Sequence, residues 1–311
     1  MKRINVFELG ALYRDNFRVT GFQFGGEEKS ACIIGSMRGN ENQQLYTCSL
    51  LIRKLKELEE RGKIAKGQGI MVIPCANPYS MNVKKRFWTI DNTDINRMYP
   101  GYDEGETTQR IAAGVFEAVK DYTYGIQFPS YYMPGTFLPH IRVMKTGMED
   151  LELAKQFEMP YVILHEPRPF DTTTLNYNWQ IWETKAFSVY TTNTSTVNKK
   201  SAKEAVEGIL SFLSKQGILV YHKFSGYNSA IVDGKKLINV RTTEAGFFES
   251  KVNVGEDVLK GQLLAYVYDV YTHEILSELK SPVDGVVFFL HNDPMTYANT
   301  AVMKIIEDEQ W

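Results

Sequence analysis

The chain has 311 residues, of which 43% are hydrophobic and 23% are charged, and its formal net charge at pH 7 is −2. A chain of this length can bury a large core and has room for two domains. Its small net charge gives no reason to expect nucleic acid or an anionic membrane as a partner. No hydrophobic run approaches the roughly 18 residues of a membrane-spanning helix.

The first 17 residues carry charges within their hydrophobic stretch, which is untypical of a signal peptide. The three cysteines, Cys32, Cys48 and Cys75, are an odd number and lack metal-type spacing. Two of them lie in hydrophobic, strand-like runs. We therefore expect reduced thiols packed in the core of a cytoplasmic protein.

From residue 31 to about 218, short hydrophobic runs alternate with helical stretches. The runs of strand length are 30–37, 69–76, 124–128, 139–144, 160–165 and 186–192. The stretches with hydrophobic residues at helical spacing are 41–62, 107–122, 148–158 and 201–217, the last ending at Gly217 as a C-cap. This alternation predicts an α/β domain with a mostly parallel sheet and with ligand chemistry in loops beyond the strand ends.

From about Val220 the chain contains only short strand-like runs, punctuated by glycines and Pro282. This change predicts two domains, an α/β domain over 1–220 and a β-rich domain over 221–311. The β-rich part resembles the half-barrels of biotinyl and lipoyl carrier domains, which display a modified lysine at a hairpin tip. Here the corresponding tip, residues 269–273, has no lysine, so we do not expect a swinging-arm role.

The segment ANPYSMNVKKRFWTIDNTDINRMYPG, residues 76–101, is the most specific motif. It resembles the second signature of the succinylglutamate desuccinylase/aspartoacylase family, within the zinc-carboxypeptidase superfamily. The family's pattern is matched at Asn77-Pro78, Arg86, Asp94, Asn96-Arg97 and Pro100-Gly101. The resemblance covers nearly the whole chain. It implies a mixed sheet flanked by helices, followed by a small C-terminal all-β domain of the barrel-sandwich type.

The resemblance also assigns substrate-binding residues. It implies that Asn96 and Arg97 hold a ligand carboxylate, while Arg86 faces the ligand's carbonyl. A guanidinium suits this role because its rigid fork of donors matches a carboxylate. The alternative is that Arg97 only ties down a loop through Asp94 or Asp91.

The family's zinc site is altered in this chain. The family holds zinc with histidine, glutamate and a second histidine. Glu41, in the stretch IIGSMRGNENQ, matches the glutamate, whereas Arg38 and Pro129 stand at the two histidine positions. A protonated arginine offers no lone pair and a proline ring offers no ligand. We therefore expect zinc to be absent or weakly bound, and Arg38 to pair with Glu41. Two solvated turn residues are the alternative.

The family's general base, a glutamate, is also replaced. Its strand corresponds to residues 186–196, which contain no acid, and Tyr190 or Thr192 occupies the position. Glu244 lies after the last helix of the first domain, so we interpret it as a residue of the β-rich part. A new metal site made of His165, Glu166 and Glu41 is a further alternative.

Three functions remain open from the sequence. The first, which we favour, is a protein that has lost zinc-dependent amide hydrolysis and retains a pocket for a small carboxylate or N-acyl amino acid. The second is an active metal-dependent hydrolase of N-acyl amino acids with a non-standard metal site. The third is a structural or assembly protein. Paired subunits are common in the family, so a homo-oligomer is possible, but the sequence leaves the oligomeric state open.

Overall fold

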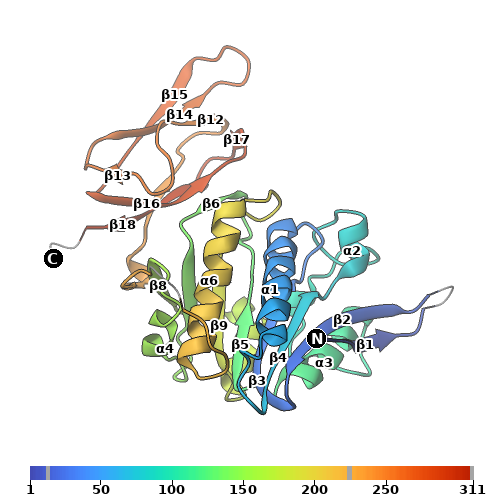
Figure 1. Cartoon of the computed structure of the whole chain (residues 1–311). Coiled ribbons are helices and arrows are strands. Elements are labelled where there is room, and N and C mark those ends of the chain that lie inside the picture. The colour runs from blue at the N-terminus through green and yellow to red at the C-terminus, as the bar shows by residue number, and fades with distance from the viewer. Residues whose placement is uncertain (12–14, 223–225, 309–311) are drawn as a thin grey trace. The chain divides into compact units, whose positions relative to one another are not determined.

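The computed structural model describes residues 1–11, 15–222 and 226–308, and the chain divides into two compact units. The first unit comprises Met1–Ser130 and Pro139–Ile231. The second comprises Tyr131–Leu138 and Val232–Trp311. The fold is the expected one: a large mixed sheet flanked by helices, followed by antiparallel β-sheets (Figure 1).

A nine-stranded sheet forms the centre of the first unit. In spatial order its strands are β1 (Lys2–Leu9), β2 (Phe17–Gly25), β4 (Gln68–Cys75), β3 (Glu28–Ser36), β5 (Tyr124–Gln127), β9 (Lys185–Tyr190), β7 (His140–Met144), β8 (Tyr161–His165) and β10 (Ala230–Asp233). Strands β4, β3, β5 and β9 run parallel, whereas β7 is antiparallel to β9. The predicted strands of this domain are therefore present.

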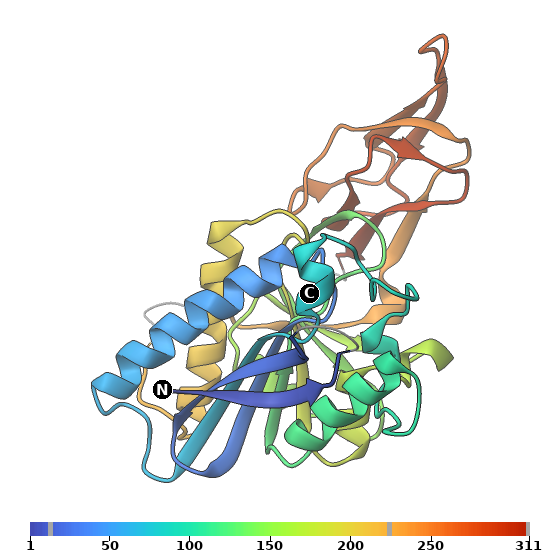
Figure 2. The ribbon, with the colours of Figure 1, turned by 90° about the vertical axis from the view of Figure 1, so that its right-hand side faces the viewer.

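Helices cover both faces of this sheet because successive strand residues point to opposite sides. Helices α1 (Asn42–Glu60) and α6 (Lys199–Lys215) lie side by side on one face (Figures 1 and 2). They pack on a core that includes Ile33. Helices α3 (Thr107–Val119) and α5 (Leu175–Ile181) cover the other face, where Cys32 and Ile34 are buried. The short helices are α2 (Pro78–Asn82), α4 (Leu151–Lys155), η1 (Ile95–Arg97) and η2 (Pro169–Asp171).

Helix α6 illustrates how local sequence sets these boundaries. The Asn198 side chain accepts a hydrogen bond from the Ser201 N–H, 2.9 Å away, and caps the first turn. After the helix, Gly217 has a positive φ of 72°, a left-handed conformation that favours glycine. The C-cap is Gln216, one residue before the predicted Gly217, which takes the left-handed position directly after it.

The second unit consists of two small β-sheets around their own core. One contains β11 (Ile238–Arg241), β18 (Ala301–Glu307), β16 (Gly285–His291) and β13 (Asp257–Val258), with β6 (Gly135–Phe137) also on β16. The other contains β15 (Ile275–Lys280), β14 (Leu263–Tyr268), β12 (Gly246–Ser250) and β17 (Met295–Thr296). A single 3-10 turn, η3 (Gly234–Lys236), precedes them. The expected hairpin tip joins β14 to β15.

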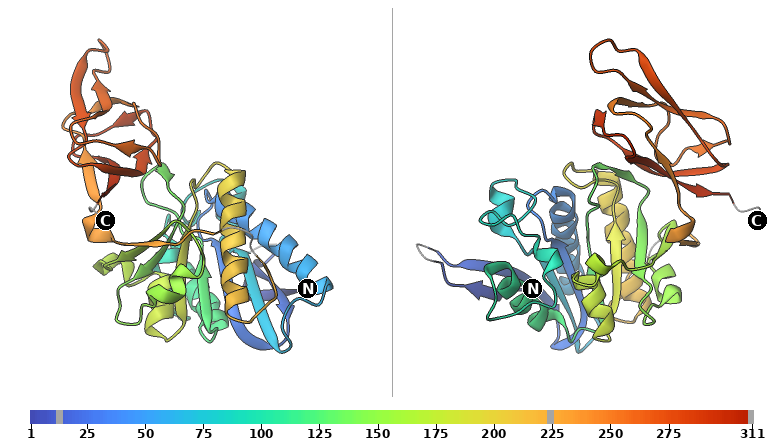
Figure 3. Two further views of the ribbon diagram at one scale, coloured as in Figure 1. Left: turned by 60° about the vertical axis from the view of Figure 1, so that its left-hand side comes forward. Right: turned by 180° about the vertical axis from the view of Figure 1, so that it is seen from behind.

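Three features of the fold differ from the sequence expectation. The division falls near residue 231 rather than 220, because the Ala230 N–H still donates to the Pro160 carbonyl of the first unit, 3.0 Å away. Residues 131–138 belong to the second unit, because Phe137 pairs in register with Phe289. The sequence analysis also missed the hairpin of β1 and β2 at the sheet edge (Figure 3).

Candidate functional site

Glu41 lies at the centre of the site, at the N-cap of α1, directly after β3 and its turn. Its side chain is fully buried. The carboxylate accepts hydrogen bonds from the backbone N–H groups of Met37 and Arg38, at 2.7 and 3.1 Å. It also accepts from Arg38 Nη1 at 3.1 Å and from Ser130 Oγ at 2.5 Å. Donors from the chain itself therefore surround both carboxylate oxygens.

Arg38 supplies the positive charge of this centre. It is only 4% exposed and binds two acids, Glu41 at 3.1 Å and Asp94 at 2.7 Å. Burial alone would lower the pKa of Arg38, but the two carboxylates raise it above its usual value. The predicted pair of Arg38 and Glu41 is confirmed, and the alternative of two solvated turn residues is wrong. Asp94, which the sequence placed in the binding motif, joins them as a second acid on Arg38 that was not predicted.

These residues do not fit a zinc ion. Zinc requires several side chains with accessible lone pairs in tetrahedral geometry. The guanidinium of Arg38 has none, and the Glu41 oxygens already accept four hydrogen bonds. Pro129 has no side-chain ligand, and its carbonyl accepts from Gln44 Nε2 at 3.2 Å. Residues 1–11, 15–222 and 226–308 contain no group of three histidine, cysteine, aspartate or glutamate side chains that could hold a metal ion.

The motif residues Asn96 and Arg97 lie on η1, which Asp94 caps by accepting a hydrogen bond from the Asn96 N–H. The Asn96 side chain accepts from Gln127 Nε2 of β5 at 3.0 Å. Arg97 is about 30% exposed and pairs with Asp171 at 3.1 Å. The loop contact that the sequence analysis offered as an alternative is present, but its acid is Asp171 rather than Asp94 or Asp91.

Arg86 belongs to the same charged neighbourhood. Its side chain is half-buried, and its guanidinium carbon lies 5.5 Å from the centre of the Phe87 ring. Burial lowers the pKa of Arg86, and the positive charge of Arg38 lowers it further, while Glu41 and Asp94 act in the opposite direction. The structure thus gathers Arg38 and Arg86, which are far apart in the sequence, around the same acids.

Tyr190 ends β9 at the position of the expected general base, and Thr192 follows beyond the strand. The Tyr190 ring is buried and stacks on His140, with ring centres 4.6 Å apart. Burial raises the pKa of Tyr190, although the positive charges of Arg142 and Arg38 oppose this effect. Its hydroxyl is therefore protonated at neutral pH and is a donor rather than a base.

The sequence analysis missed Asp171, which joins three groups of the site. Besides Arg97, Asp171 accepts from the Arg168 N–H and contacts His165 Nε2, both at 3.1 Å. Burial opposes ionisation of Asp171, yet its hydrogen bonds with His165 and Arg168 lower its pKa below the usual range. His165 thus contacts Asp171, and the Oε2 atom of Glu166 lies 3.9 Å from Nζ of Lys145. The alternative metal site of His165, Glu166 and Glu41 does not form.

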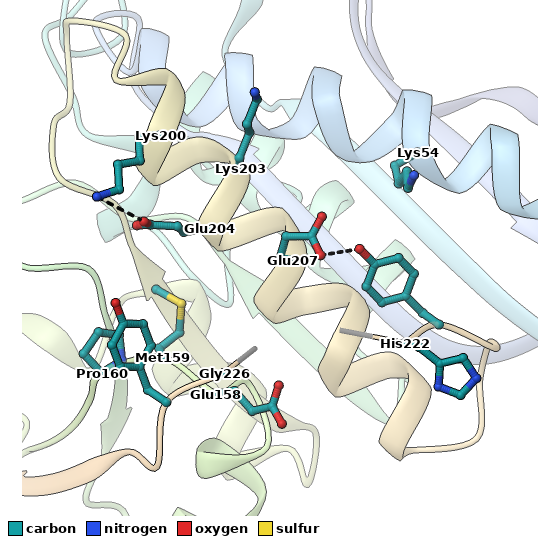
Figure 4. Close-up of a pocket in the computed structure, with 12 residues that line it drawn as sticks. Lys54, Glu158, Met159, Pro160, Lys200, Lys203, Glu204, Glu207, His222 and Gly226 are labelled. Atoms are coloured by element: carbon teal, nitrogen blue, oxygen red, sulfur yellow. Dashed lines mark hydrogen bonds and ion pairs between the residues drawn. The ribbon is translucent and has the colours of Figure 1, made fainter. Parts of the chain in front are cut away.

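A separate surface pocket of about 890 Å³ lies between α1, α6 and the segment after α6 (Figure 4). Three lysine and three glutamate side chains are among its lining, and several are already paired. Lys200 lies 3.9 Å from Glu204, and Tyr221 donates to Glu207. Its lining includes none of the motif residues, so we do not assign it to the site described above.

Comparison with known proteins identifies the family. The sequence model of the succinylglutamate desuccinylase/aspartoacylase catalytic domain matches residues 27–215, more than half of the chain. The chain belongs to this family. Its members are in general zinc-dependent and remove acyl groups from N-acyl amino acids. None of the helices in the described part of the chain has the length and hydrophobicity needed to span a bilayer.

Individual relatives are distant. The N-alpha-acetyl-L-2,4-diaminobutyric acid deacetylase of Halomonas elongata is 23% identical over 288 residues, which cover 84% of this chain and 77% of that protein. The product-bound ectoine utilization protein EutE (DoeB) of Ruegeria pomeroyi has a TM-score of 0.80 at 18% identity, covering 97% of this chain and 93% of that chain. A succinylglutamate desuccinylase of a Silicibacter species has a TM-score of 0.81 at 19% identity, covering 98% of this chain and 95% of that chain. The structural likeness shows the fold.

Proposed function

We propose that this protein has lost zinc-dependent hydrolysis and binds a small carboxylate or N-acyl amino acid in the pocket around Arg86, Asn96 and Arg97. One observation carries the proposal. The single retained ligand residue, Glu41, is neutralised by Arg38 and hydrogen-bonded by Ser130. A metal ion would have to displace these donors and would still lack both histidines.

The chemistry of the centre supports binding rather than hydrolysis. Metal-dependent deacylation needs a water activated by the ion and a carboxylate base to accept its proton. By the family resemblance, Arg38 stands where the ion's first ligand belongs, and Tyr190 or Thr192 stands where the base belongs. A protonated tyrosine and several guanidinium groups are hydrogen-bond donors, which suit the carboxylate and carbonyl oxygens of a ligand.

The same proposal places the protein in the cytoplasm, with a small molecule as its partner and neither nucleic acid nor membrane. The free thiols of Cys32 and Cys48 are buried and Cys75 is half-buried and free, as expected in a reducing compartment. The net charge of −2 provides no electrostatic attraction to nucleic acid or to an anionic membrane.

Metal content and binding test the proposal together. We expect purified protein to contain less than stoichiometric zinc and to release no acetate from N-acetyl amino acids. We expect the same ligands to raise the melting temperature of the wild type and to do so less for Arg97→Met. Arg53→Met, on the exposed face of α1, is the matched control. One tightly held zinc per chain together with hydrolysis would establish the active-enzyme alternative instead. An absence of any ligand effect would favour a structural role.

A further inference from the structure

The guanidinium of Arg142, on β7, has no hydrogen-bond or ion-pair partner in the described part of the chain. Its neighbours Ile141 and Val143 lie in the hydrophobic core, so the Arg142 side chain is on the opposite face of the sheet. There its guanidinium carbon is 4.7 Å from the centre of the Tyr190 ring. The Nε atom of Arg142 is buried and bonds to none of the described residues.

The ion pairs of the other arginines make this absence informative. The charge of Arg38 is balanced by Glu41 and Asp94, and that of Arg97 by Asp171. His165, near Arg142, cannot balance its charge, because an imidazole ring is either neutral or positively charged. Arg142 is half-buried with its Nε atom fully buried, and the hydration that it loses is not offset by an acid. A bound anion would offset this loss.

Helix α5 presents further unsatisfied polar groups beside β7. Gln180 Nε2 donates to the Met144 carbonyl at 3.1 Å, so its Oε1 atom must be the acceptor that remains without a donor. Asn176 lies one turn earlier on the same helix face and is 1% exposed. Both of its amide atoms lack partners among the described residues. Buried polar groups are almost always hydrogen-bonded, so these atoms require water or a ligand.

We propose that Arg142, Asn176 and Gln180 form a second subsite, in which Arg142 binds the ligand's carboxylate and the two amides accept its adjacent N–H. This inference rests on the proposed function and narrows its ligand. In the pocket proposed above, Arg97 and Asn96 already contact Asp171 and Gln127. Arg142 adds to them a cation that no acid of the described residues balances. The subsite favours an N-acyl α-amino acid over a carboxylate without a neighbouring N–H.

Three probes of nearly equal size test the subsite by calorimetric titration. N-acetylglycine has both features, N-acetylglycinamide lacks the carboxylate, and N-acetylsarcosine lacks the N–H. We expect the wild type to bind N-acetylglycine about tenfold or more tightly than either of the others, as expected for hydrogen bonds to charged groups. Arg142→Met should abolish the preference for the acid over the amide. Gln180→Met should abolish the preference for N-acetylglycine over N-acetylsarcosine.

Two controls keep the result interpretable. Arg142→Lys retains the charge and should retain part of the preference for the acid, whereas Arg53→Met should behave as the wild type. Melting temperatures establish that each variant is folded. If Arg142→Met binds N-acetylglycine as the wild type does while Arg97→Met does not, the subsite holds only water and the proposed function stands. If the wild type binds none of the probes, both proposals fail.

Discussion

Nη2 of Arg38 lies 2.7 Å from Oδ2 of Asp94, although the two residues are 56 positions apart in the sequence. Asp94 also caps η1, the turn that carries Asn96 and Arg97. Arg38 therefore connects the turn after β3, where the family places a zinc ligand, to the segment that carries the binding motif. The guanidinium holds the two parts of the site together while compensating both acids.

Removing this guanidinium should destabilise the protein strongly. Arg38→Met leaves the fully buried Glu41 and the half-buried Asp94 without their cation, and we expect a loss of about 3–5 kcal/mol in the free energy of unfolding. Urea denaturation at neutral pH measures it. Arg53→Met, at an exposed position, should change stability by less than about 0.5 kcal/mol. Equal stability of Arg38→Met and the wild type would mean that the two acids are not held by Arg38.

Asp171 should make stability depend on pH. The pKa of Asp171 in the folded protein lies below the ordinary value of 3.8. Ionised Asp171 therefore stabilises the fold above about pH 4. This contribution to stability is lost as the pH falls through the folded-state pKa. We expect Asp171→Asn to cost about 1–3 kcal/mol at neutral pH and progressively less in acid.

Denaturation at neutral pH and at about pH 3 checks this expectation. Asp121→Asn is the control, because Asp121 also has a lowered pKa but pairs with Lys29 at the exposed surface. It should cost less than about 1 kcal/mol. A penalty for Asp171→Asn that is the same at both pH values would show that its charge does not contribute.

Restoring the two lost ligands should restore metal binding. In Arg38→His/Pro129→His, two imidazoles join Glu41, and Ser130 already brings this chain segment against the Glu41 carboxylate. We expect zinc to raise the melting temperature of the double variant and to leave the wild type unchanged. The two single variants and magnesium are the controls. The same zinc effect on the wild type would contradict our interpretation of the centre.

Gly39 should tolerate no side chain. A Cβ atom at this position would overlap the backbone of Ser80 and the carbonyl oxygen of Lys85. The Gly39 N–H donates to the Arg86 carbonyl at 3.2 Å, so relief of the overlap would displace Arg86. We expect Gly39→Ala to cost about 1–3 kcal/mol and to weaken ligand binding. Gly10→Ala is the control, because no atom lies near the added methyl group, and it should change neither stability nor ligand binding. If Gly39→Ala is as stable as the wild type, the turn can move without cost.

The sequence by itself determined the features that depend on near neighbours. Hydrophobic periodicity predicted the helices and the parallel strands, because each repeat reports which face of an element is buried. The closeness of Arg38 and Glu41, three residues apart in one turn, predicted their pairing. The sequence analysis missed β1 and β2, because an edge hairpin with many exposed positions carries only a weak hydrophobic signal.

Only the tertiary structure decided which distant residues meet. The order of the strands brings Asp171 to Arg97 and Ser130 to Glu41, and β7 lies antiparallel beside β9 so that Arg142 reaches Tyr190. The sequence marks each of these residues only as polar within its own segment. Strand order and long-range hydrogen bonds then determine whether a charge finds a partner, which is why Arg142 became a candidate only in the folded chain.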